Sequence, residues 1–488
     1  MPAMVSAQGQ EAPMGRTVAA ASPGHAHERR WLEAAAGTLG ACLDSKISGG
    51  QFHTCSILDD AELKCWGEGA NGRLGYDTQD NKGDAAGEMA SLATVDLGAG
   101  RTAVAVSAGY DHTCAILDNA ELKCWGRGTY GQLGYDSTDQ KGVWPSMMAS
   151  LAAVLLGAGR TAVAVSAGGS HTCAILDNGD LKCWGRGTYG KLGYDSTDHK
   201  GDAAGEMASL AAVFLGAGRT AVAVSAGYYH TCVILDNGEL KCWGYGNYGQ
   251  LGYDSTDNKG GSASEMASLA AVFLGAGRTA VAVSAGYDHT CAILDNAELK
   301  CWGRGGYGRL GYDSTDNKGR SVGEMASLAA VNLGAGRTAV AVSAGYYHTC
   351  AILDNGELKC WGRGNDGRLG YDSQDTKGVS AGEMASLAAV FLGAGRTAVA
   401  VSAGYHHTCA ILDNGELKCW GLGGYGQLGY DSTDSKGREA GEMASLATVN
   451  LGLEMNDCVA PAPPPPLLPS PSPPLPPSPP PPLPSPPP

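Results

Sequence analysis

The chain has 488 residues, and 34 Lys and Arg against 49 Asp and Glu give it a formal net charge of −15. Nucleic acids and anionic membrane surfaces need a basic footprint, so this balance disfavours both as partners. No run approaches the roughly 18 consecutive apolar residues of a membrane span. The first 40 residues lack the charged start and apolar core of a secretory signal, so the N-terminus gives no cellular address.

Glycine is abundant at 74 residues, whereas phenylalanine is scarce at 4. The fold must therefore be rich in turns and cannot depend on large aromatic layers throughout. This composition favours an all-β protein.

In chain order, residues 1–46 are expected to be an N-terminal extension that is mostly disordered. A tandem repeat follows, and its cysteines reveal the period. One cysteine recurs every 59 residues, and a second follows it ten residues later, which defines seven units over residues 47–452. One unit contains VAVSAGYDHTCAILDNAELKCWGRGTYGQLGYDSTDQKG, followed by a variable patch and a segment of the MASLAAVLLGAGRTA type.

Each unit contains four short apolar runs bounded by Gly, Asn or Asp, as strands are. In the second unit they are VAVSA at 104–108, TCAIL at 113–117, LKCW at 122–125 and AAVLL near the end. Seven repeats of four strands predict a seven-bladed β-propeller, because closing into a ring removes the free sheet edges. Leucine-rich, ankyrin and tetratricopeptide repeats have much shorter periods.

The pattern AGxxHTCAxLDNGELKCWGxGxxGQLGY resembles the repeat of the regulator of chromosome condensation family, whose members form seven-bladed propellers. The resemblance covers about residues 47–452, and seven consecutive matches make it specific. It implies a binding or regulatory propeller.

The hairpin between the paired cysteines is clearest in the third unit. Asp177-Asn178-Gly179 forms a three-residue loop whose register sets Cys173 opposite Cys183. Ala61, Ala120 and Ala297 replace this glycine in three units, at an expected cost of up to about 1 kcal/mol each. Opposed cysteines predict intrablade disulfides, which we assign to the pairs Cys55–Cys65, Cys114–Cys124, Cys173–Cys183, Cys232–Cys242, Cys291–Cys301, Cys350–Cys360 and Cys409–Cys419.

Free buried thiols are the alternative, and a zinc site using His112, Cys114 and Cys124 would still need a fourth ligand. The two remaining cysteines, Cys42 and Cys458, flank the repeat. Because a ring brings its ends together, we predict that they form a clasp that stabilises the fold by several kcal/mol. Sixteen paired cysteines favour an oxidising compartment.

Every unit also repeats one tryptophan and one histidine. The tryptophans, from Trp66 to Trp420, are expected to fill the core between adjacent blades. The histidines, from His53 to His407, are expected to form hydrogen bonds within their blade. A catalytic site would give one unit a distinctive nucleophile, base and orienting partner, and no unit differs from the others in this way. We therefore expect that the protein is not an enzyme.

Alternating strands place the loop between the first and second strands on one face, together with the start of the connection between the third and fourth. The units differ from one another there, whereas the turns of the opposite face barely vary. Tyr and Arg are frequent interface anchors, so this face is the predicted binding surface. Its candidate residues are Tyr110, Arg127, Tyr130, Arg186, Tyr189, Tyr228, Tyr229, Tyr245, Tyr248, Tyr287, Arg304, Tyr346, Tyr347, Arg363, Tyr405 and His406.

The DSTDNKG segment, as at 254–260, has carboxylates at its first and fourth positions but lacks the spacing of a calcium loop. We therefore expect a solvated loop and assign neither a metal nor another cofactor.

Residues 453–488 are expected to form a proline-rich tail, in which 19 of the last 30 residues are Pro. Such a segment adopts polyproline II and serves as a stiff spacer or as a ligand for aromatic grooves. It resembles the hydroxyproline-rich glycoproteins of plant and green-algal cell walls, which implies an extracellular location.

Three functions in the family can be compared with this sequence. Nucleotide exchange on the Ran GTPase is tied to an inserted wedge and a basic arm, and neither is seen here. The photoreceptor motif GWRHT has the counterpart Gly109-Tyr110-Asp111-His112-Thr113, in which Tyr replaces Trp. Secreted bacterial propellers that inhibit β-lactamases bind proteins through one face and offer the nearest analogy.

Two hypotheses follow from the sequence. The first is a monomeric, non-catalytic propeller, extracellular or associated with the cell wall, that binds a protein or a repetitive wall polymer or glycan. The second is an intracellular regulator of a small GTPase, similar to a guanine nucleotide exchange factor. The paired cysteines and the proline tail favour the first, and the missing signal peptide favours a cytoplasmic location.

Overall fold

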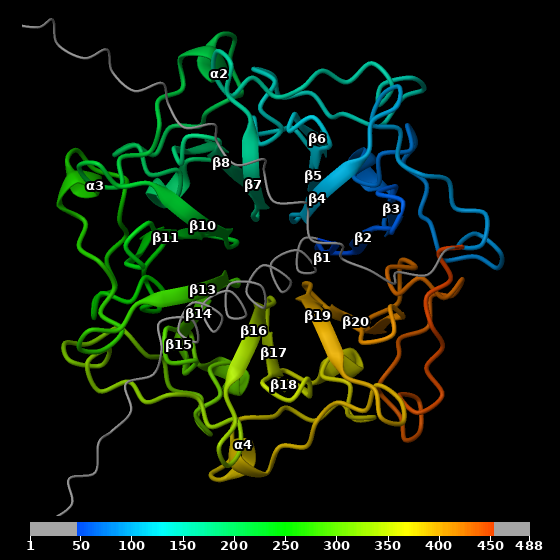
Figure 1. Ribbon diagram of the computed structural model, residues 1–488, viewed down its shortest axis with the longest axis vertical. Helices are drawn as coiled ribbons and strands as arrows, with labels where there is room; N and C mark the ends of the chain where they lie inside the picture. Colours follow the sequence, from blue (N-terminus) through cyan, green and yellow to red (C-terminus); the bar gives the residue numbers. More distant parts are fainter. Residues whose placement is uncertain (1–45, 453–488) are drawn as a thin grey trace, which may run out of the picture. The chain divides into compact units, whose positions relative to one another are not determined.

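Seven near-identical β-sheets surround a common axis in the computed structural model, which describes residues 46–452 (Figure 1). Each sheet is one repeat, or blade, with three antiparallel strands in sequence order, and the blades are numbered 1 to 7 along the chain. The predicted all-β, seven-bladed propeller is confirmed. The expected N-terminal extension before Lys46, the tail 453–488 and the Cys42–Cys458 clasp lie outside the described residues.

The innermost strand of each blade lies beside the axis (Figure 1). These strands are β1 (Ile47–Gly49), β4 (Ala103–Ala108), β7 (Ala162–Ala167), β10 (Ala221–Ala226), β13 (Ala280–Ala285), β16 (Ala339–Ala344) and β19 (Ala398–Ala403). The middle strands are β2 (His53–Ile57), β5 (His112–Leu117), β8 (His171–Leu176), β11 (His230–Leu235), β14 (His289–Leu294), β17 (His348–Leu353) and β20 (His407–Leu412). The outer strands are β3 (Leu63–Gly67), β6 (Leu122–Gly126), β9 (Leu181–Gly185), β12 (Leu240–Gly244), β15 (Leu299–Gly303), β18 (Leu358–Gly362) and β21 (Leu417–Gly421).

The long connection that leaves each outer strand contains the few helical turns. Three four-residue helices lie at the periphery of the ring: α2 (Glu206–Ser209), α3 (Glu265–Ser268) and α4 (Glu383–Ser386) (Figure 1). Four 3-10 turns lie closer to the outer strands: η1 (Ala70–Gly72), η2 (Thr188–Gly190), η3 (Gly306–Gly308) and η4 (Asn365–Gly367).

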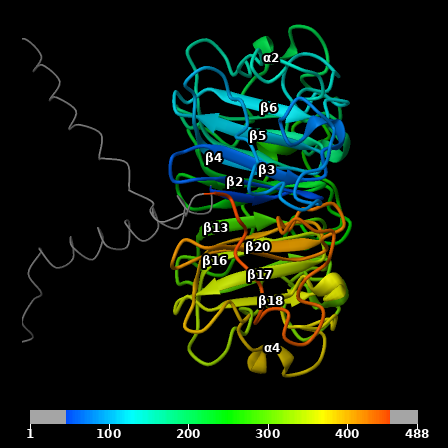
Figure 2. The same ribbon diagram turned by 90° about the vertical axis from the view of Figure 1, so that its right-hand side faces the viewer.

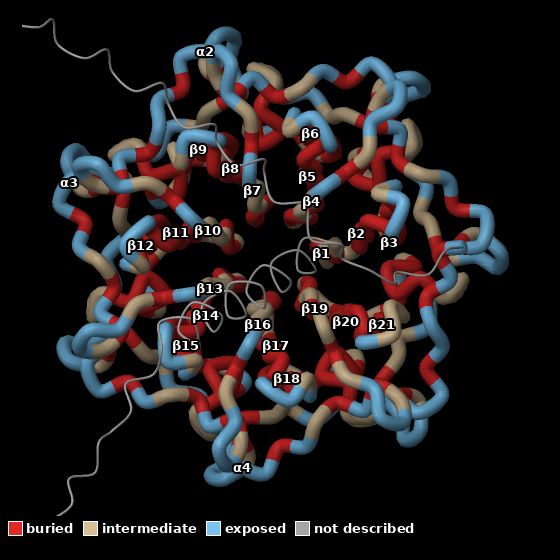
Figure 3. The backbone as a smooth tube through the Cα atoms, viewed as in Figure 1, coloured by how far each residue is buried: buried red, intermediate tan, exposed pale blue. Residues whose placement is uncertain are grey.

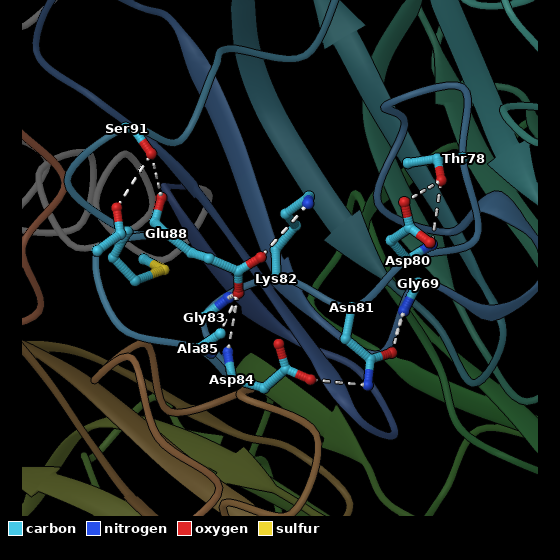
Figure 4. Close-up of polar contacts among 12 residues, drawn as sticks. Gly69, Thr78, Asp80, Asn81, Lys82, Gly83, Asp84, Ala85, Glu88 and Ser91 are labelled. Atoms are coloured by element: carbon cyan, nitrogen blue, oxygen red, sulfur yellow. Dashed lines mark hydrogen bonds and ion pairs between the residues drawn. The ribbon is translucent and has the colours of Figure 1, made fainter.

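Polar contacts close this connection on itself, as Figure 4 shows for blade 1. One carboxylate oxygen of Glu88 accepts hydrogen bonds from the backbone N–H groups of Gly83, Asp84 and Ala85, at 2.9 to 3.3 Å. The Asn81 side chain accepts the N–H of Gly69 at 3.1 Å. The connection is therefore an ordered part of the blade.

The prediction of four strands in each blade was wrong, since every blade has three strands. The segment expected as the fourth strand makes one ladder bond, from Val154 N–H to Leu122 O at 2.7 Å in blade 2. Beyond this bond the segment contacts the next blade. In blade 1, for example, the carbonyl of Leu97 accepts a hydrogen bond from the Lys123 ammonium of blade 2 at 2.9 Å. The same bond from Lys64 to Leu451 O joins blade 7 to blade 1 and closes the ring.

The hydrophobic core is divided into layers between neighbouring blades. Trp125 is completely buried and packs against the Cys55–Cys65 pair and Leu63 of the preceding blade. Its indole N–H donates to Arg73 O of that blade at 3.0 Å, so the buried donor is satisfied. The predicted interblade role of the tryptophans is confirmed, and Figure 3 shows the burial concentrated within the blades.

The repeated histidines bond between blades, so the prediction of bonds within a blade was wrong. His53 and Thr54 are consecutive strand residues and point to opposite sides of their blade. His53 Nε2 therefore meets Thr113 Oγ1 of blade 2 at 2.9 Å, while Thr54 Oγ1 meets His407 Nε2 of blade 7 at 2.8 Å. All seven pairs repeat this contact around the ring.

These contacts fix the protonation of the rings. Thr113 has one hydroxyl proton and donates it to Arg73 O at 2.9 Å, so His53 Nε2 must carry the proton that Thr113 accepts. Burial lowers the pKa of His112, His230 and His407 to about 3. The histidines are therefore neutral at physiological pH.

The hairpins between middle and outer strands have the predicted register, with Cys173 opposite Cys183. All seven predicted intrablade disulfides are present. Gly179 has a φ of +79°, and Ala61, Ala120 and Ala297 have φ values of +62° to +63°. These alanines occupy the left-handed region, as predicted.

Replacing these alanines should relieve the strain of a side chain in the left-handed region. Ala120→Gly is expected to raise the free energy of unfolding by up to about 1 kcal/mol. The reverse change, Gly179→Ala, should lower it, because the added Cβ would lie 2.6 Å from Thr220 Cβ. Urea denaturation of both variants measures the two effects, and a stabilised Gly179→Ala variant would contradict this account.

The neutral histidines predict sensitivity to acid. Between pH 6.5 and 3 these histidines are protonated in the unfolded protein but not in the folded one. The free energy of unfolding therefore falls as the pH falls through this window. Each of the three histidines whose folded pKa is about 3 should cost about 2 kcal/mol at pH 5. Denaturation curves between pH 7 and 4.5 measure the protons taken up on unfolding, and His112→Gln should reduce that number by about one at the lower end of this range. An unchanged proton uptake would contradict the assignment.

Candidate binding face

The loops of the propeller gather on two opposite faces, as the side view shows (Figure 2). The first face carries the loop between inner and middle strands and the start of the long connection. The contact between Asp111 of the one loop and Arg127 of the other, at 3.1 Å, shows that they are neighbours. The second face carries the hairpins and the loops that enter the inner strands.

Five tyrosines meet at the axis on the first face and form a closed circuit of ring contacts. Their centroids are 3.5 Å apart for Tyr287 with Tyr346 and for Tyr346 with Tyr405. The ring centroid of Tyr110 lies 5.6 Å from that of Tyr405 and 5.1 Å from that of Tyr228. The centroids of Tyr228 and Tyr287 are 4.6 Å apart, which completes the circuit. Burial raises the pKa of these tyrosines, so they remain protonated.

The circuit lies over a cavity of about 100 Å³ on the axis. The Ala-Gly pair at the end of each inner strand, replaced by Gly49-Gly50 in blade 1, lines this cavity together with Gln51, Gly169 and the five tyrosines. Glycine is required there, because a Cβ on Gly109 would lie 2.6 Å from both Gly168 O and the His112 ring. The tyrosines thus cap the central channel.

A second row of aromatic residues surrounds this circuit. Tyr229 lies 5.5 Å from Tyr245 and 5.9 Å from Tyr189, measured between ring centroids. Tyr347 lies 5.7 Å from Tyr307 in the same way. The outermost rings, Tyr189 and Tyr307, are 39% and 42% exposed and are therefore open to a partner.

Guanidinium groups lie over the outer tyrosines. Arg186 lies 4.9 Å from the centroid of Tyr130, and Arg304 lies 4.8 Å from that of Tyr248, each across a blade boundary. Arg363 lies 5.1 Å from both Tyr307 and Tyr347. These distances are those of cation–π pairs, which hold the arginines along the surface.

The structure brings all the predicted face residues onto this one surface, which we call the aromatic face. Three of them have an altered role: Arg127 and Arg304 are neutralised by Asp111 and Asp288, and His406 is uncharged because burial lowers its pKa to about 3. Phe52 was placed among the variable residues of this face but left out of the candidates, and its ring stacks on His406 at 5.6 Å. Its signal was its place after the Gly50-Gln51 pair, where the other units carry Tyr, Asp, Ser or His.

Sequence reasoning also missed a set of buried cations beneath the face: Arg73, Lys191, Arg309 and Arg368. Their signal was an alternation at the position before Leu-Gly, where blades 2, 4 and 7 carry Gln instead. The Gln side chain accepts an N–H of its own loop, as Gln132 does from Tyr130 at 2.9 Å. In the blades with Arg or Lys, the residue that corresponds to Tyr130 has a positive φ, which is +67° for Tyr189 and +65° for Tyr307.

The first carboxylate of the DSTDNKG segment has a structural role. Asp254 accepts the N–H groups of Gly323 and Met325 in the next blade, each at 2.8 Å, so only the tip of this segment is a solvated loop. Among residues 46–452 no group of three or more acidic, His or Cys side chains is placed to hold a metal. Nor does any helix in this described range have the length and apolar character needed to cross a membrane.

Fold and surface together define a disulfide-containing, seven-bladed propeller with one aromatic, arginine-bearing face. The family model described as the RCC1-like domain matches residues 28–381, and that of the RCC1 repeat matches residues 398–427. The chain therefore belongs to the family of RCC1-like propellers.

Known relatives agree with this assignment. The ultraviolet-B receptor UVR8 of Arabidopsis thaliana is 28% identical over 78% of each chain. The human E3 ubiquitin-protein ligase HERC2 is 28% identical over 67% of this chain, which spans only 6% of that relative. The crystal structure of Prp20p from Saccharomyces cerevisiae superposes with a TM-score of 0.60 at 18% identity, covering 84% of this chain and 89% of that one.

Proposed function

We propose that the protein is a non-catalytic recognition propeller that binds a protein or a repetitive wall polymer through its aromatic face, outside the cell. The observation that carries this proposal is the concentration of exposed and half-buried tyrosines on one face. Tyrosine supplies a large, rigid contact area with a polar tip, which makes it a frequent anchor of interfaces.

The second face supports the choice by contrast. Six of its arginines each pair with the aspartate of the neighbouring hairpin, at 2.9 to 3.2 Å. Charges that satisfy each other in the same way in blade after blade offer little to distinguish a partner. The loops of the aromatic face differ from blade to blade in Tyr, Asp, Ser and His side chains.

The described residues also support the absence of catalysis. Each repeated, buried histidine is neutral, and its Nε2 is hydrogen-bonded to a threonine of the next blade. None of them is therefore available as a general base. The seven disulfides support an oxidising, extracellular setting, since such bonds persist there and are rare in the cytosol.

The second candidate is an intracellular regulator of a small GTPase. Its support is the likeness to Prp20p, whose structure was described together with its binding to Gsp1p and histones. At 18% identity that likeness concerns the fold. The disulfides weigh against this candidate, because a cytosolic protein would keep these cysteines reduced.

Two exposed tyrosines allow a test that leaves the fold intact. Blade 1 carries Asn71, with a φ of +62°, at the position that Tyr189 and Tyr307 occupy in blades 3 and 5. Asparagine tolerates this conformation better than tyrosine, so the double variant Tyr189→Asn, Tyr307→Asn should match or exceed the wild type in thermal stability.

We expect this double variant to lose at least roughly tenfold in retention on isolated plant cell-wall material, because each lost tyrosine removes an anchor. The matched control is Phe214→Asn with Phe391→Asn, which removes two aromatic rings that are 50% and 49% exposed and lie outside the aromatic face. The control should bind like the wild type. Equal retention of both double variants would contradict the proposed face.

A further inference from the structure

The aromatic face differs in charge from the rest of the molecule. We count the seven loops between inner and middle strands together with the eight residues that begin each long connection, from Gly67–Leu74 to Gly421–Leu428. These segments contain eight cationic side chains and four acidic ones, although the whole chain has a net charge of −15. The cations are Arg73, Arg127, Arg186, Lys191, Arg304, Arg309, Arg363 and Arg368, and the acids are Glu68, Asp111, Asp288 and Asp366.

Half of these cations have no carboxylate partner within residues 46–452. The ion pairs of the face use Arg73, Arg127, Arg304 and Arg368. Arg186, Lys191, Arg309 and Arg363 form none. Unpaired positive charge therefore gathers in blade 3 and across blades 5 and 6.

Two of the unpaired cations are buried beneath the surface. Lys191 is 2% exposed, and its ammonium donates one long hydrogen bond of 3.4 Å, to Tyr228 O. Burial and the nearby Arg186 lower its pKa to about 7. Arg309 is fully buried, and its Nη2 has no hydrogen-bond partner within the described range. Asp288 compensates Arg309 only in part, so an anion above these groups would stabilise their charge further.

The other two unpaired cations are accessible and lie beside tyrosine rings. Arg186 lies over Tyr130, and Arg363 lies over Tyr307 and Tyr347. A guanidinium binds a carboxylate through two parallel N–H groups. The partly exposed rings of Tyr189 and Tyr307 offer apolar surface in the same loops as these arginines or in the loop beside them. A ligand that fits both must carry its carboxylate on a rigid, partly apolar ring.

We propose that the aromatic face binds a polyuronate, a polysaccharide whose successive sugar rings each carry a carboxylate. The C–H faces of the sugars stack on the tyrosines, and the carboxylates pair with Arg186 and Arg363. A polymer that repeats this unit engages several blades at once and gains avidity from it. An acidic peptide offers carboxylates without the rigid ring. This inference rests on the proposed function and names its ligand class.

The test is isothermal titration calorimetry of the full-length, oxidised protein with polygalacturonate. Arg186→Gln with Arg363→Gln should weaken binding roughly tenfold or more, because two charge-assisted contacts are lost. The matched control is Arg219→Gln with Arg337→Gln, which removes two arginines that pair with aspartates on the second face. The control should bind within roughly twofold of the wild type, and thermal melts establish that all variants fold.

Two further ligands complete the experiment. Fully methyl-esterified polygalacturonate keeps the sugar rings but has no charge, and it should bind at least roughly tenfold more weakly. Polyglutamate keeps the charge but has no ring, and it should also bind more weakly. Equal binding of either ligand, equal loss in the control variant, or no binding of polygalacturonate would overturn the inference. If the tyrosine variant still loses retention on wall material in that case, the proposed function stands and only the ligand class is wrong.

Discussion

The contact between each blade's disulfide and the tryptophan of the next blade is the interaction on which the rest of the structure depends. Trp125 lies against Cys55–Cys65, and the same layer recurs at every blade boundary. Leucine, methionine and tyrosine side chains such as Leu74, Met148 and Tyr76 fill the rest of each layer. Each disulfide also closes a hairpin of ten-residue separation, worth about 3 kcal/mol in the chain-entropy model.

This layer explains why the repeats are uniform inside and variable on one face. The Ala-Gly pair, the His-Thr pair and the tryptophan each touch a neighbouring blade, so a change in one unit must be matched in the next. The residues that follow the Ala-Gly pair, such as Tyr110 and Asp111, lie at the first face, where their side chains contact one another and neighbouring loops. Variation is tolerated there, and a partner can use it.

Much of the fold could be predicted because it is local in sequence. The 59-residue period gives seven blades, and the three-residue hairpin sets Cys173 opposite Cys183 without any knowledge of neighbouring blades. The errors concern contacts between blades. The bond from Lys123 to Leu97 O at the fourth segment joins residues of different units, as does that of His53 with Thr113. The aromatic residues of the face were predicted individually, but their circuit around the axis and the cations beneath them depend on the closed ring.

The oxidation state of the cysteines tests the central claim most directly, because both the interblade core and the extracellular setting require disulfides. Intact mass spectrometry of the protein, before and after alkylation in denaturant without reductant, counts the free thiols, including those that are buried in the folded protein. The account predicts that none of the fourteen cysteines of the seven blades reacts. Many reactive thiols among them would contradict it and would direct the search for partners to small GTPases inside the cell.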